Sequence, residues 1–217
     1  MSTRSEVRAR LRELYKSAPR DMYFEAIRSE ITQYYLADPG NPYQQSGRSS
    51  GAERWRQTRH CIVEAVHRDG DFLDVGCANG LLLESLIGWA AARGTALRPH
   101  GLDFVPALVE LARQRLAPYA GSFEVANAFY WTPPRQFDFV RTNLEYVQPG
   151  DWPAFIARQY SAVAEGGRLI VCHYREPEEA VDVEALLSGL GYEVSGHREA
   201  PGVSVVWCER QVARGYK

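Results

Sequence analysis

From Gly70 onward the chain alternates short apolar runs with helical stretches, and this alternation restricts the fold more than any other feature. The apolar runs are FLDVGC, HGLDF, SFEVANA, FDFVRTNL and RLIVCHY. Stretches of helical length separate them, such as NGLLLESLIGWAAARG and PALVELARQRLA. Strands that alternate with helices pair in a parallel sheet, because each helix returns the chain to the start of the next strand. We therefore expect five parallel strands.

The end of the chain departs from this alternation. A helix expected near VDVEALLSGLG is followed by the runs YEVSGHR and VSVVWCER, joined by a short turn with Pro201 and Gly202. Two strands joined so closely must be antiparallel. The expected fold class is therefore α/β, a Rossmann-like seven-stranded sheet with five parallel strands plus a C-terminal antiparallel hairpin, and helices on both faces.

The first third of the chain predicts a helical extension. Apolar residues recur at three- and four-residue steps over residues 4–36, and Pro19 divides this stretch into two amphipathic helices. The segment ADPGNPYQQSGRSSG is a loop or arm, because it is rich in Pro, Gly and Ser. A third helix is expected from about Ala52 to His67. We divide the chain into an N-terminal helical extension that covers the active site, residues 1–69, and a ligand-binding core, residues 70–217, within one domain.

Composition excludes several classes of protein. The 217 residues carry a formal charge of -2, whereas general nucleic-acid binding requires clustered basic residues. The four cysteines are scattered without a C-x-x-C pair, which favours a reducing compartment and gives no zinc-ligand spacing. No apolar run approaches the roughly 18 residues that span a bilayer, and the first residues have no apolar signal core. We expect a cytoplasmic protein with no bound metal and no membrane partner.

The loop FLDVGCANG, residues 72–80, is the most specific ligand signal. Gly76, Ala78 and Gly80 occupy alternate positions, and small residues there let the backbone turn sharply and approach a ligand closely. The order matches neither the dinucleotide fingerprint G-x-G-x-x-G nor a phosphate-binding P-loop. Asp74 at the start of the loop favours an ammonium or sulfonium group over phosphate. Asp103, after the next strand, is placed to accept hydrogen bonds from ribose hydroxyls, or alternatively to cap the helix PALVELA.

These residues resemble the D/E-x-G-x-G-x-G loop of the class I S-adenosylmethionine-dependent methyltransferases, with Ala78 in place of the middle glycine. The resemblance covers roughly residues 70–208, including the closing hairpin. It implies that S-adenosylmethionine is the cofactor and S-adenosylhomocysteine the product. By position it implies these cofactor contacts: Asp74, Gly76, Cys77, Ala78, Asn79 and Gly80 in the loop, Asp103 at the ribose, Phe104 stacked on adenine, and Asn127 and Ala128 at the adenine edge. The family often has Asp at Asn127, whose amide oxygen can still accept from the adenine amino group.

In this family the loop after the fourth strand lies beside the transferable methyl group. The resemblance therefore places Asn143, Glu145 and Tyr146 there, and their spacing resembles the N-P-P-Y motif of base methyltransferases without its prolines. A hydroxyl or ammonium acceptor requires a base, for which Glu145, His173 and Tyr174 are the candidates; Tyr146 is a further candidate catalytic residue, and Tyr174 is also a candidate acceptor contact. The alternatives are that His173 has a structural role and that Glu145 holds an arginine of the N-terminal arm.

The N-terminal extension is expected to select the acceptor. Tyr43 and Gln45 in the arm, with Trp55, are candidate acceptor contacts, and Arg59 is a candidate for the methionyl carboxylate. Alternatively, Trp55 packs against the sheet and Arg59 lies on a solvated face. We expect methyl transfer to an oxygen or nitrogen of a small molecule, an activity of the EC 2.1.1 class. Two alternatives are a non-catalytic S-adenosylmethionine-binding protein and a tRNA or rRNA methyltransferase, although nucleic acid is an unlikely partner on charge. The oligomeric state is not indicated.

Overall fold

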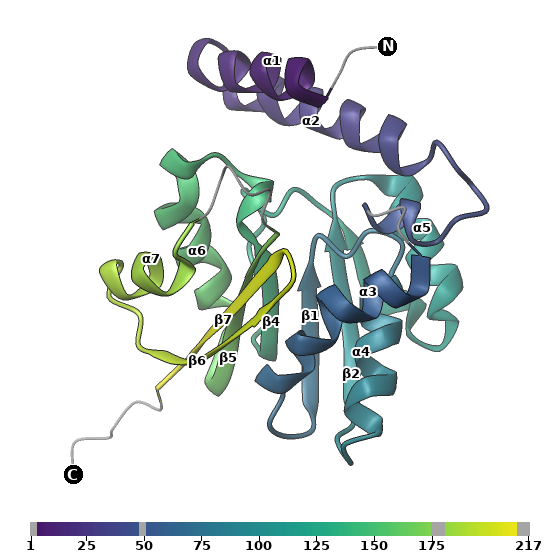
Figure 1. Ribbon diagram of the computed structural model, residues 1–217, viewed down its shortest axis with the longest axis vertical. Coiled ribbons are helices and arrows are strands. Elements are labelled where there is room, and N and C mark those ends of the chain that lie inside the picture. Colours follow the sequence, from purple (N-terminus) through teal and green to yellow (C-terminus); the bar gives the residue numbers. More distant parts are fainter. Residues whose placement is uncertain (1–3, 48–50, 175–180, 212–217) are drawn as a thin grey trace.

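The computed structural model describes residues 4–47, 51–174 and 181–211, and its centre is one seven-stranded sheet (Figure 1). The strand order is β3-β2-β1-β4-β5-β7-β6. The strands are β1 (Gly70–Val75), β2 (Leu97–Asp103), β3 (Phe123–Val125), β4 (Phe137–Asn143), β5 (Val163–His173), β6 (Val194–Ala200) and β7 (Val203–Glu209). Strands β1 to β5 are parallel to one another, and β7 is antiparallel to both β5 and β6. The expected fold class is confirmed.

Helices cover both faces of the sheet. They are α1 (Arg4–Ser17), α2 (Arg20–Tyr35), α3 (Gly51–Arg59), α4 (Leu81–Ala91), α5 (Pro106–Arg115), α6 (Trp152–Ser161) and α7 (Val183–Gly189). Short 3₁₀ turns lie at Gln44–Ser46, His60–Ala65, Ala117–Ser122, Leu144–Tyr146 and Pro149–Asp151. Neighbouring residues of each strand face opposite ways, so Phe72 packs toward α4 while Leu73 packs toward α6. This two-sided burial explains why the parallel strands read as continuous apolar runs.

Two elements differ from the expected boundaries. The third helix was expected to continue to His67, but α3 ends at Arg59 and the chain tightens into a 3₁₀ turn. With three residues per turn, this segment turns Ile62 and Ala65 toward the same side, and both are fully buried. The third strand was expected over SFEVANA, but β3 ends at Val125. A turn follows, in which the Tyr130 N–H donates to the Asn127 carbonyl at a distance of 3.0 Å.

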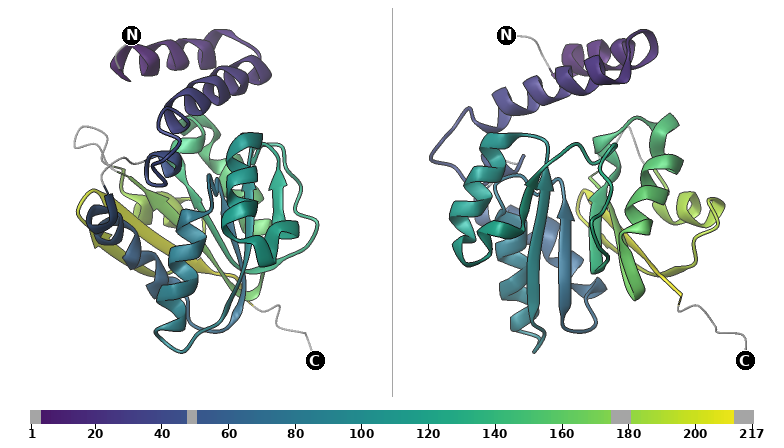
Figure 2. Two further views of the ribbon diagram at one scale, coloured as in Figure 1. Left: turned by 90° about the vertical axis from the view of Figure 1, so that its right-hand side faces the viewer. Right: turned by 180° about the vertical axis from the view of Figure 1, so that it is seen from behind.

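The α1–α2 pair lies over the end of the sheet at which the parallel strands finish, rather than on either face (Figure 2). Pro19 separates the two helices, as expected. On one side, the Tyr23 hydroxyl accepts a hydrogen bond of 2.9 Å from Nε2 of Gln148, which lies in the segment after β4. On the other, Phe24 packs on Phe129 after β3, with ring centroids 5.3 Å apart. Helix α2 therefore crosses both halves of the sheet. In the described part of the chain, no helix has the length and apolar character needed to cross a membrane.

Candidate functional site

The loop after β1 is built on left-handed backbone positions. Gly76, Ala78 and Gly80 have φ values of 77°, 48° and 76°, and Ala78 is the sole non-glycine residue with positive φ in the described ranges. A side chain in that region costs about 1 to 2 kcal/mol. The Ala78 N–H donates to Asp103 Oδ2 at 3.0 Å, a charge-assisted bond that offsets the strain. The alanine is therefore compatible with the loop.

Asp103 joins this loop to the start of α5. Its Oδ1 accepts from the Val105 N–H at 2.9 Å, while Oδ2 holds Ala78. Val105 is the N-cap residue of α5, and no described side chain caps that helix. The Asp103 carboxylate therefore accepts from the residue before the helix and not from an N–H of the first helical turn. Burial raises the pKa of Asp103 to about 6. Each carboxylate oxygen accepts one backbone N–H and keeps a second lone pair for a ligand hydroxyl.

Asp74 and Arg141 form a buried ion pair beneath the loop. Asp74 Oδ1 lies 3.0 Å from Arg141 Nη1, and the two side chains are 1% and 3% exposed. Burial raises the pKa of Asp74 to about 6, against the opposing effect of the Arg141 charge. The second oxygen, Oδ2, is also buried and has no hydrogen-bond partner among the described residues. The negative charge expected to face a ligand is therefore largely balanced within the protein, while one acceptor atom remains available.

Arg141 also orients two tyrosines from neighbouring segments. Its Nη1 donates to Tyr146 Oη at 3.3 Å, and its Nη2 donates to Tyr174 Oη at 2.8 Å. The Tyr146 hydroxyl in turn donates to the Gly76 carbonyl at 3.1 Å. The Tyr146 ring lies so close to Gly76 that a Cβ there would approach it to 2.2 Å. Burial raises the pKa of Tyr146, so this hydroxyl stays protonated and acts as a donor.

Arg59 lies beside this network and is 7% exposed. Its guanidinium stacks on the Tyr174 ring at 3.7 Å from the centroid and lies 5.1 Å from the Trp55 ring. Its Nη1 donates to the Thr58 carbonyl at 3.3 Å, and no ion pair to a described acidic residue is formed. Trp55 is buried and donates from Nε1 to Ser85 Oγ on α4 at 3.0 Å. Arg59 thus lies in the interior and not on a solvated face, whereas Trp55 packs in the core.

Glu145 and His173 meet at the ends of β4 and β5. Glu145 Oε1 lies 2.8 Å from His173 Nδ1 and accepts from the Tyr174 N–H at 2.6 Å. Asn143 Oδ1 accepts from the Glu145 N–H at 3.2 Å and so fixes the turn that presents the glutamate. In the described chain the partner of Glu145 is therefore His173 and not an arginine of the N-terminal arm.

Asn127 and Ala128 were both expected at the edge of the adenine, but only Asn127 lines a pocket in the structure. Phe104 and Asn127 line a pocket of about 320 Å³, whose other wall is α2. Ala128 is not among the lining residues, and its carbonyl accepts from Gln159 Nε2 at 3.1 Å. A pocket of this size is in the range of about 300 to 1,000 Å³ typical of small-molecule sites.

Asn79 fastens the N-terminal arm to the glycine loop. Its Nδ2 donates to the Pro42 carbonyl and to Gln45 Oε1, at 3.0 and 3.2 Å. Its Oδ1 accepts from Ser46 Oγ and from the N–H of Leu81. Leu81 is the first residue of α4, and Gly80 between them is the N-cap residue of that helix. Gln45 and Asn79 are both buried, so their polar atoms serve the contact between arm and loop. Tyr43 packs beside Trp55, and residues 48–50 of the predicted arm lie outside the described chain.

Comparison with known proteins agrees with this architecture. Residues 72–167 match the family model described as a methyltransferase domain. Residues 72–167 therefore carry a methyltransferase domain, and its fold is of the class I type. It is 34% identical over 99 residues to the trans-aconitate 2-methyltransferase of Methylobacterium radiotolerans, a match that covers 46% of this chain and 36% of that relative. The chain thus matches little more than a third of that relative's length.

Solved structures share the fold of this methyltransferase domain over most of the chain. The N-methyltransferase NodS of Bradyrhizobium japonicum with S-adenosylhomocysteine has a TM-score of 0.66 at 16% identity, and the match covers 84% of this chain and 97% of that one. The 1,6-didemethyltoxoflavin-N1-methyltransferase of Burkholderia thailandensis, bound to 1,6-didemethyltoxoflavin and S-adenosylhomocysteine, has a TM-score of 0.65 at 15% identity. That match covers 90% of this chain and 92% of that one.

Two residues at the site of this methyltransferase domain were not expected from the sequence. Arg141 was read as part of an apolar strand, although a charged residue within FDFVRTNL signals a buried partner. Tyr35 at the end of α2 lies near Asp103 and Arg59, and burial raises its pKa to about 12. Among the described residues, His, Cys, Asp and Glu form no group of three able to hold a metal ion.

Proposed function

We propose that this protein transfers the methyl group of S-adenosylmethionine to an oxygen or nitrogen of a small-molecule acceptor. The observation that carries the proposal is a row of four complementary features along one end of the sheet. They are the unpartnered Asp74 Oδ2, the buried Arg59 without a described acidic partner, the Asp103 carboxylate, and the pocket of Phe104 and Asn127. The names of the similar proteins, two of them N-methyltransferases of solved structure, are in keeping with a small acceptor.

The residues fit the parts of the cofactor. Asp74 Oδ2 is a buried acceptor suited to an ammonium group, and Arg59 is a buried cation suited to a carboxylate. Asp103 offers a lone pair on each oxygen to the ribose hydroxyls, and Phe104 offers a ring face to the base. The positive φ values of the loop bring its backbone, including Cys77 and Gly80, close to such a ligand.

Asn143, Glu145 and His173 are then the residues nearest the transferred group. When bound, S-adenosylmethionine supplies a methyl group on a sulfonium that is already an activated leaving group, so positioning supplies much of the acceleration. Glu145 Oε1 lies 2.8 Å from His173 Nδ1 and can balance the charge that the ring gains, and we assign to His173 the removal of the proton from an acceptor hydroxyl or ammonium group. Tyr146 and Tyr174 act as positioning residues through Arg141. The extension of residues 1–69, with Tyr43 and Trp55, forms the cover on the acceptor side.

Calorimetric titration with S-adenosylhomocysteine tests the cofactor assignment. We expect the native chain to bind it and Arg59→Gln to weaken binding about 10- to 100-fold, because a hydrogen bond to a charged group contributes roughly 1.5 to 3 kcal/mol. Arg56→Gln is the matched control, since Arg56 is exposed on the same helix. A folded native chain that does not bind S-adenosylhomocysteine contradicts the proposal.

Turnover tests the catalytic assignment. Incubation with methyl-labelled S-adenosylmethionine and a fractionated extract is expected to label a small molecule. His173→Ala is then expected to lower kcat about 10²- to 10⁴-fold, and Glu145→Gln by less, with little change in the KM for the cofactor. Tight cofactor binding without any labelled product would favour a non-catalytic binding protein. Labelled RNA with a steep salt dependence would favour a tRNA or rRNA methyltransferase.

A further inference from the structure

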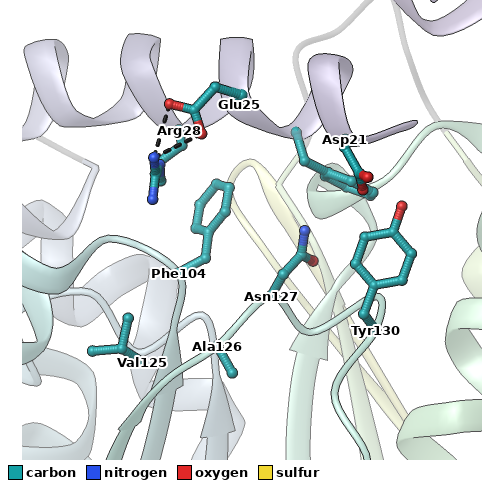
Figure 3. A pocket seen from close by; sticks show the side chains of 9 residues that line it. Asp21, Glu25, Arg28, Phe104, Val125, Ala126, Asn127 and Tyr130 are labelled. Carbon is teal, nitrogen blue, oxygen red and sulfur yellow. Dashed lines mark hydrogen bonds and ion pairs between the residues drawn. The ribbon is translucent and has the colours of Figure 1, made fainter. Parts of the chain in front are cut away.

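Helix α2 forms one wall of the pocket that Phe104 and Asn127 line from the sheet. The wall consists of Asp21, Phe24, Glu25 and Arg28, and Figure 3 shows the side chains of Asp21, Glu25 and Arg28 above those of Phe104 and Asn127. The N-terminal extension therefore reaches the base-binding end of the site as well as the expected acceptor end. The following inference rests on the proposed function, because it concerns how the cofactor's base is recognised there.

The orientation of the Asn127 amide is fixed by its own backbone. Asn127 Oδ1 accepts from the Phe129 N–H at 2.9 Å, and a backbone N–H can pair only with the amide oxygen, which identifies the two ends of the side chain. The amide nitrogen consequently points toward α2 (Figure 3). Asn127 thus presents N–H donors to the pocket, whereas the sequence suggested that its oxygen accepts from the adenine amino group. A donor at this position suits a ring nitrogen of the base.

The acceptor for the amino group must then come from another residue, and the pocket contains two carboxylates. Glu25 is occupied, because its two oxygens lie 2.8 and 2.7 Å from Arg28 Nη2. Asp21 pairs with no arginine or lysine in the described chain. The Tyr130 hydroxyl points at the Asp21 carboxylate (Figure 3), and the pKa of Tyr130 is raised by burial and then by this contact. The Tyr130 hydroxyl therefore lies on the side of Asp21, and the Asp21 carboxylate, which lines the pocket, keeps lone pairs for a ligand.

We propose that Asp21 accepts a hydrogen bond from the exocyclic amino group of adenine while Asn127 Nδ2 donates to the adjacent ring nitrogen. Together the two side chains form an acceptor–donor pair complementary to the Watson–Crick edge of adenine. Hypoxanthine reverses both positions, with a carbonyl oxygen in place of the amino group and a protonated ring nitrogen. Its oxygen would face the Asp21 carboxylate and its N–H would face an amide donor. Hypoxanthine would therefore lose both hydrogen bonds, one of them to a charged group. Part of the base selectivity is thus assigned to α2, a helix outside residues 70–217.

Calorimetry with two ligands tests this assignment, using S-adenosylhomocysteine and its deaminated analogue S-inosylhomocysteine. We expect the native chain to prefer the adenosyl ligand about 10- to 100-fold, and Asp21→Ala to lose most of that preference, with weaker binding of the adenosyl ligand and unchanged or tighter binding of the inosyl ligand. Glu25→Ala is the matched control, since Glu25 lines the same pocket one turn further along α2, and it is expected to keep the native preference. Thermal unfolding of each variant verifies that α2 is retained.

The possible results separate the two proposals. An equal loss of affinity for both ligands in Asp21→Ala would overturn the base-reading role, because a purely structural residue affects both alike. An unchanged preference in Asp21→Ala would overturn it as well. If the native chain binds neither ligand, the proposed function itself fails. A native chain that binds both equally retains the proposed function and refutes the role of Asp21.

Discussion

Replacing Arg141 by methionine removes one half of the buried ion pair under the glycine loop. Removal of one partner of such a pair costs about 3 to 5 kcal/mol, because the remaining charge is left without compensation. The side chains of Asp74 and Arg141 are 1% and 3% exposed, so water cannot replace the guanidinium. The pKa of Asp74 is about 6 with Arg141 present and rises further without it. The loss relative to the native chain is therefore expected to grow as the pH rises through about 6, because the native carboxyl then ionises beside Arg141 whereas the carboxyl of the folded variant stays protonated.

Urea-induced unfolding measures this effect directly. A loss of 3 to 5 kcal/mol corresponds to a decrease in Tm of about 6 to 20 °C for a domain of this size. The matched control is Arg68→Met, because Arg68 forms a 2.9 Å ion pair with Asp138 but is 41% exposed. The control is expected to lose under about 1 kcal/mol. The double variant Asp74→Asn/Arg141→Met removes both charges and should be more stable than Arg141→Met alone.

Two results would refute this reasoning. The first is a loss of unfolding free energy in Arg141→Met no larger than that in Arg68→Met, which would mean that the buried pair is solvated in solution. The second is additivity: if the double variant loses the sum of the unfolding free energies lost by Asp74→Asn and by Arg141→Met, the two residues do not interact.

Three further predictions follow from neighbouring contacts. Asp103→Asn should gain stability relative to the native chain as the pH rises from 4 to 7, by about 3 kcal/mol in urea titrations. The folded pKa of about 6 exceeds the ordinary value of 3.8, so ionisation of Asp103 costs the folded state about 1.4 kcal/mol per pH unit; no pH-dependent difference would contradict the assignment. Gly76→Ala should destabilise the chain well beyond Gly94→Ala in thermal unfolding. Both glycines have positive φ, a strain of about 1 to 3 kcal/mol, but only at Gly76 does a Cβ meet Tyr146, at 2.2 Å; equal losses would refute that contact. Asn79→Ala should speed proteolysis of the arm around residues 41–47, because it removes the hydrogen bonds that hold the arm to the loop, and an unchanged cleavage rate would count against this.

The sheet was predictable from the sequence because each buried strand is a continuous apolar run. The turn at Pro201 and Gly202 identified the antiparallel hairpin equally well. Helical periodicity failed after Arg59, since an amphipathic pattern does not distinguish an α-helix from the tighter 3₁₀ turn that buries Ile62 and Ala65. The boundary at residue 69 and the roles of the site residues stay predictions.

The site was less predictable, since its geometry depends on contacts between distant segments. The position of Asp74 in the loop indicated an acid near a ligand, but the partner Arg141 lies 67 residues away. Likewise, Asn127 was expected to accept through its oxygen, and a local backbone bond to Phe129 takes that oxygen instead. No spacing in the sequence placed Asp21 opposite Asn127, because that arrangement depends on how α2 packs over the sheet.

The ion pair of Asp74 and Arg141 also constrains how this chain can diverge. Asp74 on β1 and Arg141 on β4 are register partners, and Arg141 reaches Tyr174 after β5, so three segments depend on one guanidinium. Loss of either charged residue first passes through an unpaired buried charge, a step that selection opposes. Related sequences should therefore keep both residues or exchange both together for neutral ones, and Tyr174 should vary with them.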